Sequence, residues 1–231
     1  MIDRRTFMLT SLATVLMPRA VTAGTRADKS LSWTDYLTEM KQLASAYADK
    51  AITQGDMAAR GVQLLQQLDI ADNEFQAAVH ASYESGNQFW LWQRLTKESG
   101  IKGGILNIGQ DQDVPLHDHP GATGMVRILS GEVEVWQFDL ASMTTEPANN
   151  RAVLERVTHR VMQPGDIAVL SPDDGNIHAL RARSKTCSML DYFIPPYVRS
   201  ERTWFQPVDA DWFGKMHITC RCIHENDFYM S

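Results

Sequence analysis

The sequence predicts a mainly β fold, an antiparallel sandwich or barrel that follows a layer of helices. Apolar residues recur at helical spacing between residues 30 and 80. From residue 88 onward, short apolar runs alternate with turns that contain Gly or Pro. Many short strands separated by such turns are typical of antiparallel β architectures. The length of 231 residues suits one domain of good size with additional segments.

The first 23 residues differ in kind from the rest of the chain. Arg4 and Arg5 precede a short apolar stretch over residues 7–17, and small residues follow it. This is the pattern of an export signal, and residues 3–8 resemble the twin-arginine signal that exports folded proteins. The apolar stretch is too short for a typical membrane-spanning helix. We therefore expect a signal peptide over residues 1–23, a periplasmic location, and no stable membrane insertion once the signal is removed.

The helical part of the chain divides into three expected helices. Ser30 or Ser32 can cap the first of them, whose apolar residues lie on one face. We expect Gly55 and Asp56 to break this run. A second helix over 58–68 and a third over 74–83 follow, and together the helices provide a packing layer.

Short apolar runs define the β part of the chain. The turns at 130–131 and 163–166 separate strands, and the polar stretch 141–150 is expected to be a loop. The expected strands run over 89–92, 104–108, 125–129, 132–138, 157–162, 167–170, 177–182 and 188–194. The predicted organisation is therefore a signal over 1–23, a helical segment over 24–87 that packs on the barrel, and the barrel over 88–231.

Charge and cysteine content exclude several classes of function. The formal net charge is −6, and no basic cluster suited to nucleic acid is present in the sequence. Three cysteines are too few for a disulfide framework. We expect no nucleic-acid partner, and we expect a monomer.

Two histidines, His117 and His119, lie one residue apart in the segment PLHDHPGATG. Side chains at positions i and i+2 of a strand point to the same side, and two neighbouring imidazoles suit a transition metal. A third ligand should come from another strand. The candidate is His178, which follows a turn and begins an apolar strand.

The histidines, together with Gly131 and the turn Pro164-Gly165-Asp166, resemble the two motifs of the cupin barrel. In the common cupin pattern a glutamate follows the second histidine at the position that Gly124 holds here, and the later spacing to Gly131 is kept. The resemblance therefore implies a site of three neutral histidines without a carboxylate. A substrate thiolate would supply the missing negative charge at such a site, as in thiol dioxygenases.

Three longer segments sharpen this resemblance. PLHDHPG (115–121), GNIH (175–178) and LDYFIPPY (190–197) are similar to the cysteamine (2-aminoethanethiol) dioxygenase and plant cysteine oxidase family, over about residues 104–206. The resemblance implies Fe(II) held by the three histidines and oxidation of a thiol by O2 to the sulfinic acid. It also implies that Asp191 hydrogen-bonds a substrate amine and that Tyr197 lines the pocket. Asp191 is notable in itself, because it interrupts an apolar strand and a buried carboxylate needs a partner.

The chain departs from the family after the PPY segment. Some members carry a Cys and a Tyr there that can crosslink, whereas residues 200–205 (SERTWF) contain neither, so we expect no crosslink. We expect Trp204 and Phe205 to reshape the pocket mouth. The sequence therefore leaves three candidate substrates: cysteamine, cysteine and the N-terminal Cys of a peptide.

Two other functions fit the same sequence motifs. One is another metal-dependent cupin enzyme, such as a lyase, an isomerase or a carbon-cleaving dioxygenase. The other is a cupin that binds a small ligand without catalysis. The imidazoles by themselves accept several metals besides iron.

The remaining cysteines and histidines are interpreted as structural. The segment HITCRCIH (217–224) could bind a second metal, but side chains at i and i+2 of a strand stand roughly 6–7 Å apart, which is too far for two short Cys side chains to share one zinc. We therefore favour an ordinary strand with free Cys220 and Cys222. Cys187 is expected to be buried, and His80 and His159 are expected to be solvated.

Overall fold

The computed structural model describes residues 30–84, 88–89, 91–110, 112–144 and 150–228. The export signal expected over residues 1–23 lies outside the described residues and stays a prediction. Among the described helices, none combines the length and the apolar character that crossing a membrane requires.

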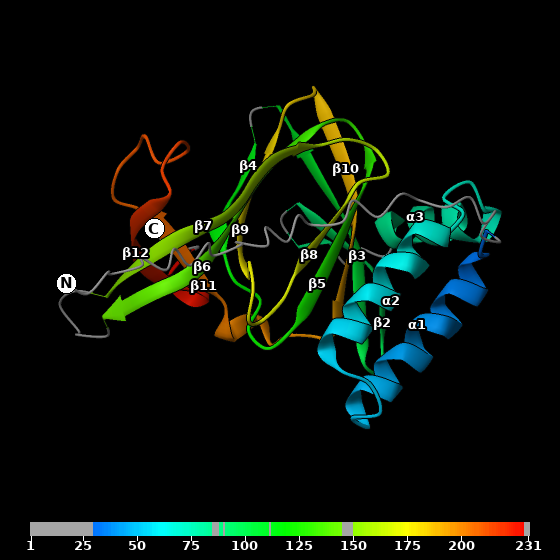
Figure 1. Ribbon diagram of the computed structural model, residues 1–231. Helices are drawn as coiled ribbons and strands as arrows, with labels where there is room; N and C mark the ends of the chain where they lie inside the picture. Colours follow the sequence, from blue (N-terminus) through cyan, green and yellow to red (C-terminus); the bar gives the residue numbers. More distant parts are fainter. Residues whose placement is uncertain (1–29, 85–87, 90, 111, 145–149, 229–231) are drawn as a thin grey trace, which may run out of the picture.

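Three helices form one side of the molecule: α1 (Trp33–Ala48), α2 (Gln54–Gln67) and α3 (Asn73–Glu84) (Figure 1). Ser32, one of the two candidate serines, caps α1 by accepting a hydrogen bond from the backbone N–H of Asp35. The expectation that Gly55 and Asp56 break the helical run is wrong. Thr53 caps α2, and its backbone N–H donates in turn to the Asp56 carboxylate, so that both residues lie in the first turn.

The described strands form two layers. One is an antiparallel sheet in the order β1-β2-β3-β10-β5-β8, and the other is a closed set of six in the order β11-β12-β7-β6-β9-β4. The first layer contains β1 (Gln88–Phe89), β2 (Trp92–Glu98), β3 (Ile101–Gly109), β5 (Thr123–Ser130), β8 (Ile167–Leu170) and β10 (Thr186–Ile194). The second contains β4 (Asp113–His117), β6 (Val133–Thr144), β7 (Arg151–Met162), β9 (Ile177–Ala182), β11 (Thr203–Pro207) and β12 (His217–His224). A short 3-10 helix (Arg199–Glu201) and α4 (Glu225–Phe228) complete the described elements.

Two expected boundaries in the β part are wrong. The expected strand over 89–92 is interrupted at Leu91, which lies in a turn between β1 and β2. The expected loop over 141–150 is in part a hairpin, since β6 continues to Thr144 and pairs with β7. The hydrophobic pattern could not reveal this extension because the side chains near its end are exposed, Met143 by 42%.

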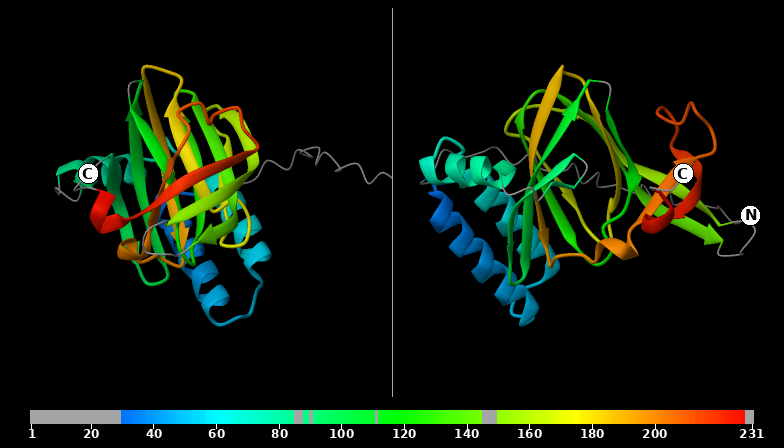
Figure 2. Two further views of the ribbon diagram at one scale, coloured as in Figure 1. Left: turned by 90° about the vertical axis from the view of Figure 1, so that its left-hand side faces the viewer. Right: turned by 180° about the vertical axis from the view of Figure 1, so that it is seen from behind.

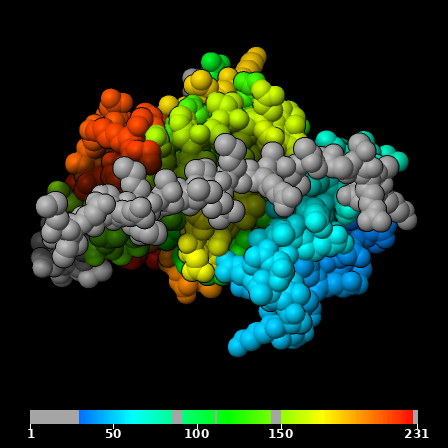
Figure 3. Space-filling view, in the orientation of Figure 1, coloured from blue at the N-terminus to red at the C-terminus, as the bar shows by residue number. Residues whose placement is uncertain are grey.

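Strand alternation divides the first layer into two faces. On β10, Leu190, Tyr192 and Ile194 are buried in the cluster that contains the helices, whereas Met189 is buried with residues of the second layer. The helices therefore cover the outer face of the first sheet, and β11, β12 and the C-terminal part lie on the opposite side of the barrel (Figure 2). Helices α1 and α2 protrude at one corner (Figure 3). This confirms the mainly β cupin barrel with an N-terminal helical layer.

Arg127 of β5 fastens the helical layer to the barrel. Its Nη1 donates to the backbone carbonyls of Leu65 and Leu68, the latter over 3.0 Å. Leu65 lies in the last turn of α2 and Leu68 caps its C-terminus, where helical hydrogen bonds run out. The expected boundary between the segments 24–87 and 88–231 stays a prediction.

Candidate metal centre and its cavity

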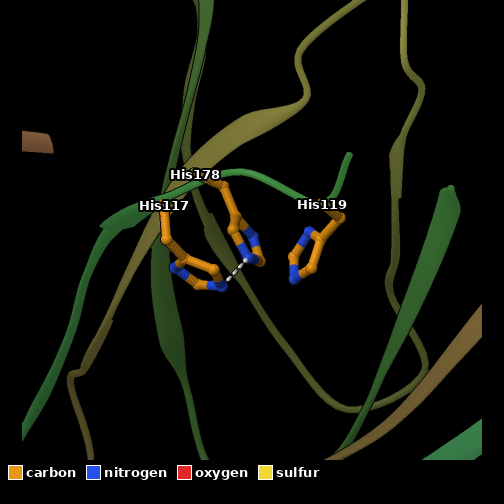
Figure 4. Close-up of side chains that lie close together, drawn as sticks. All are labelled: His117, His119 and His178. Atoms are coloured by element: carbon orange, nitrogen blue, oxygen red, sulfur yellow. Dashed lines mark hydrogen bonds between the residues drawn. The ribbon is translucent and has the colours of Figure 1, made fainter. Parts of the chain in front are cut away.

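The three predicted ligands come together inside the barrel (Figure 4). His117 ends β4 and lies directly opposite His178 of β9 in the strand register. One ring nitrogen from each of His117, His119 and His178 lies within 4.8 Å of the others, and all three side chains are buried. The Nε2 atoms of His117 and His178 are 3.2 Å apart.

His119 lies two residues beyond the end of β4, so strand alternation alone does not fix its direction. The Asn176 side chain, just before β9, accepts a hydrogen bond from the His119 backbone N–H over 3.2 Å. Asp118 accepts another from the Thr203 backbone N–H over 2.7 Å, which joins the end of β4 to β11. Asn176 and Asp118 belong to the GNIH and HDHPG segments, and the structure gives both of them a role in placing the ligands.

Burial keeps the three imidazoles neutral. It lowers the pKa of His117 and of His119 well below the usual value, and the pKa of His178 to about 3. The Nδ1 of His117 lies 2.8 Å from the Pro115 carbonyl, which holds the ring proton there and leaves the lone pair on Nε2. Neutral imidazoles that converge in this way are good ligands for a transition metal, so the residues present fit a metal ion.

Gly124 holds the position where the common cupin pattern has a glutamate, and the surroundings of this position are tightly packed. A Cβ atom on Gly124 would lie 3.1 Å from both Leu170 Cδ1 and Phe193 Cε1. The Phe193 ring packs 4.6 Å from the His119 ring, between centroids. Within the described residues, the metal-ligand cluster consists of the three histidines without an acid.

A cavity of about 190 Å³ opens beside the histidines, between the two layers. Both predicted catalytic residues, Asp191 and Tyr197, line it. The other lining residues are Trp92, Arg94, Lys102, Leu106, Val114, His117, His119, Val126, His178, Leu180, Arg199, Arg202 and Trp204. Trp204 lies opposite His117 in the strand register, with 4.9 Å between the ring centroids. Phe205 instead packs in a hydrophobic cluster of the second layer, so only Trp204 shapes the cavity as expected.

Asp191 is a buried carboxyl group on the inner face of β10. Burial raises its pKa to about 7, although the positive charges of Lys102 and Arg202 act in the opposite direction. Its Oδ1 atom has no hydrogen-bond partner within the described structure. Asp191 is therefore close to balance between its protonated and ionised forms at neutral pH.

Tyr197 forms one wall of the cavity. Its ring packs 4.9 Å from His119 and 4.8 Å from Phe193, between centroids. Its hydroxyl accepts a hydrogen bond from Nη2 of Arg202. Burial raises the pKa of Tyr197 to about 12, so the phenol keeps its proton.

The sequence did not point to the cations of the cavity. Arg202 follows the motifs without belonging to them, and its place is set by tertiary packing. Lys102 carries one local signal, because it interrupts an apolar strand in the same way as Asp191 does.

The segment HITCRCIH forms β12, an ordinary strand of the second layer. Cys220 and Cys222 are buried, whereas His217 and His224 are exposed, so the four side chains do not converge. Cys187 is buried as expected.

The two histidines expected to be solvated have exposed side chains with partners. His80 lies 3.6 Å from Glu84. His159 is 36% exposed, but it stacks on Trp136 and lies 2.8 Å from Glu134.

Comparison with known proteins gives a family match and several relatives. The sequence model of the family described as PCO_ADO matches residues 55–209, more than half of the chain. Plant cysteine oxidase 2 of Arabidopsis thaliana is 31% identical over 86 residues, which cover 36% of this chain and 31% of that protein. The 2-aminoethanethiol dioxygenase of Mus musculus is 25% identical over 126 residues, which cover 46% of this chain and 48% of that protein. The chain thus spans about a third to a half of the length of these relatives.

Solved structures similar to the chain are more distant. A protein of Klebsiella pneumoniae with a double-stranded β-helix domain is 16% identical, with a TM-score of 0.35 over 45% of this chain and 75% of that chain. A protein of Shewanella frigidimarina with a cupin-2 domain is 12% identical, with a TM-score of 0.32 over 51% of this chain and 95% of that chain.

Proposed function

The chain belongs to the PCO_ADO family, and we propose on this basis that it is a thiol dioxygenase. The proposed reaction adds both atoms of O2 to the sulfur of a thiol, so that R–SH and O2 give the sulfinic acid R–SO2H. The observation that carries this proposal is the cluster of three neutral histidines without an acid, which opens on a cavity lined by residues of the family motifs.

His117, His119 and His178 would hold the metal, which we propose to be Fe(II). When bound, iron supplies the redox chemistry with O2 and lowers the pKa of a nearby thiol. The three imidazoles add no negative charge to the site, so the position nearest to them favours an anionic thiolate. Gly124, at the position of the cupin glutamate, supplies no carboxylate to that place.

Asp191 and Tyr197 would orient the substrate. The Asp191 carboxyl group lines the cavity, where it can accept a hydrogen bond from a substrate amine. The Tyr197 hydroxyl already accepts from Arg202, which leaves its own proton free to donate into the cavity.

A substrate panel tests this function. Protein loaded with Fe(II) is offered cysteamine, cysteine, 3-mercaptopropionate and a peptide with an N-terminal Cys, and products are identified by mass spectrometry while O2 uptake is recorded. We expect a gain of two oxygen atoms on at least one thiol. Bound zinc or nickel without O2 uptake would favour another cupin enzyme, and thiol binding without O2 consumption would favour a binding protein.

We further propose that the chain is exported to the periplasm by its N-terminal segment. The support is the pattern of Arg4 and Arg5 before a short apolar stretch and small residues. Replacement of both arginines by lysine should leave the protein in the cytoplasm of a bacterial host, as measured by cell fractionation. Unchanged export of this variant would rule out the twin-arginine route.

A further inference from the structure

The cavity beside the three histidines carries more positive charge than binding a thiol or an amine requires. Four cationic side chains line it, against one acidic side chain, that of Asp191. The cations are Arg94, Lys102, Arg199 and Arg202. Cations gathered in a partly enclosed site favour an anionic ligand.

Arg202 is buried, with only 7% of its surface exposed. Its Nη2 donates to the Tyr197 hydroxyl, and its Nη1 lies 4.0 Å from a Glu225 carboxylate oxygen. Its Nε has no hydrogen-bond partner within the described structure. Arg202 lines the cavity, and a buried guanidinium there is suited to bind an oxygen anion.

Glu225 offsets only part of this positive charge, because its single carboxylate pairs with two of the four cations, Arg199 and Arg202. Its carboxylate lies 3.2 Å from Nε of Arg199 and accepts a hydrogen bond from Nε1 of Trp204 over 2.6 Å. It is thus shared among three donors, and it does not line the cavity.

Lys102 lies against the same aromatic ring as Arg202. Its Nζ is 4.7 Å from the centroid of the Tyr197 ring, and Cζ of Arg202 is 5.1 Å from that centroid. The two cations are therefore within about 10 Å of each other, a range over which partly buried charges interact. Burial and then the charge of Arg202 lower the pKa of Lys102, while the charge of Asp191 acts in the opposite direction. Among the described residues, no carboxylate forms a salt bridge with Lys102, so an anion from the substrate would relieve this repulsion.

We propose that Lys102 and Arg202 bind a carboxylate of the substrate, so that the preferred substrates are thiols with a free carboxylate a few bonds from the sulfur. This rests on the proposed function as a thiol dioxygenase. Free cysteine and 3-mercaptopropionate have such a group. Cysteamine has none, and in a peptide with an N-terminal Cys an amide stands in the place of the cysteine carboxylate.

The test compares L-cysteine with L-cysteinamide, which differ only in the replacement of the carboxylate by an amide. A charge-assisted hydrogen bond contributes about 1.5–3 kcal/mol, so we expect at least a tenfold higher kcat/KM for cysteine, mainly through KM. Lys102→Met should raise the KM for cysteine but not for cysteinamide, so that the two substrates then have nearly equal kcat/KM. Lys102→Arg should restore part of the preference, and Lys185→Met, at an exposed lysine outside the cavity, should leave it unchanged.

Anaerobic binding of the same two ligands separates this inference from the proposed function. Binding is followed by the fluorescence of the tryptophans, two of which, Trp92 and Trp204, line the cavity. A preference for cysteine that depends on Lys102 would support the carboxylate site even if no thiol is oxidised in air. Equal affinity for cysteine and cysteinamide would overturn the proposed carboxylate site. So would an equal loss of affinity for both ligands in Lys102→Met.

Discussion

Asp191 makes the stability of the metal-free protein depend on pH, and its replacement by asparagine should remove that dependence. The carboxyl group has an ordinary pKa of 3.8, and burial raises this to about 7 in the folded protein. Between these two values the folded protein retains a proton that the unfolded chain has released. Folding stability therefore falls as the pH rises from about 4 to about 7.

The size of the effect follows from the two pKa values. Each pH unit between them changes the free energy of unfolding by about 1.4 kcal/mol, which gives about 4 kcal/mol over the whole range. Asp118, whose pKa burial raises to about 6, acts in the same direction in both proteins. The difference in the free energy of unfolding between Asp191→Asn and the unchanged protein therefore isolates the contribution of Asp191.

Urea unfolding of both proteins after metal removal, at several pH values from 4.5 to 8.5, measures this difference. We expect the gain in stability of Asp191→Asn to grow with pH, by about 3 kcal/mol across this range. Asp173→Asn, at an exposed aspartate, serves as the control and should show no such trend. A difference between Asp191→Asn and the unchanged protein that is constant with pH would refute a buried carboxyl group with a raised pKa.

Three further substitutions test the framework of the site. Asn176→Ala removes the acceptor for the His119 backbone N–H and should weaken metal affinity by about 10- to 100-fold, as measured by a competition titration. Unchanged affinity would show that Asn176 does not place His119. Arg127→Met removes two hydrogen bonds to the C-terminal end of α2 and should lower the free energy of unfolding in urea by about 1–3 kcal/mol. A smaller loss would mean that apolar contacts alone hold the helical layer. Gly124→Glu restores the acid of the common cupin pattern but crowds Leu170 and Phe193, which must shift to admit it, so it should lower both thermal stability and turnover. A fully active variant of unchanged stability would contradict the packing described here.

The ligand cluster could be predicted from the sequence because its signals are local. The spacing of His117 and His119, and the turn before His178, show in the chain itself which imidazoles can meet. The mainly β fold was predictable for a similar reason, since strand periodicity and turn residues are read over a few positions at a time. The missing acid was also evident, as Gly124 stands in its place.

The charged side of the cavity could not be predicted, because it depends on which strands are neighbours. Lys102 and Arg202 lie 100 positions apart in the chain and meet at the Tyr197 ring only once β3 and the segment before β11 are in place. The start of α2 was misread for a different reason. Gly55 and Asp56 disfavour a helix interior, but the cap at Thr53 makes them suitable for a first turn.

The central claim, that the three-histidine site adds both atoms of one O2 to a thiol, is tested most directly with a mixture of 16O2 and 18O2. The protein loaded with Fe(II) turns over its best thiol under this mixture, and His178→Ala serves as the blank. The mass of the sulfinic acid is then measured by mass spectrometry. The proposed reaction predicts product with two 18O atoms or with none, and no product from His178→Ala. Product with a single 18O atom, or equal turnover by His178→Ala, would contradict it.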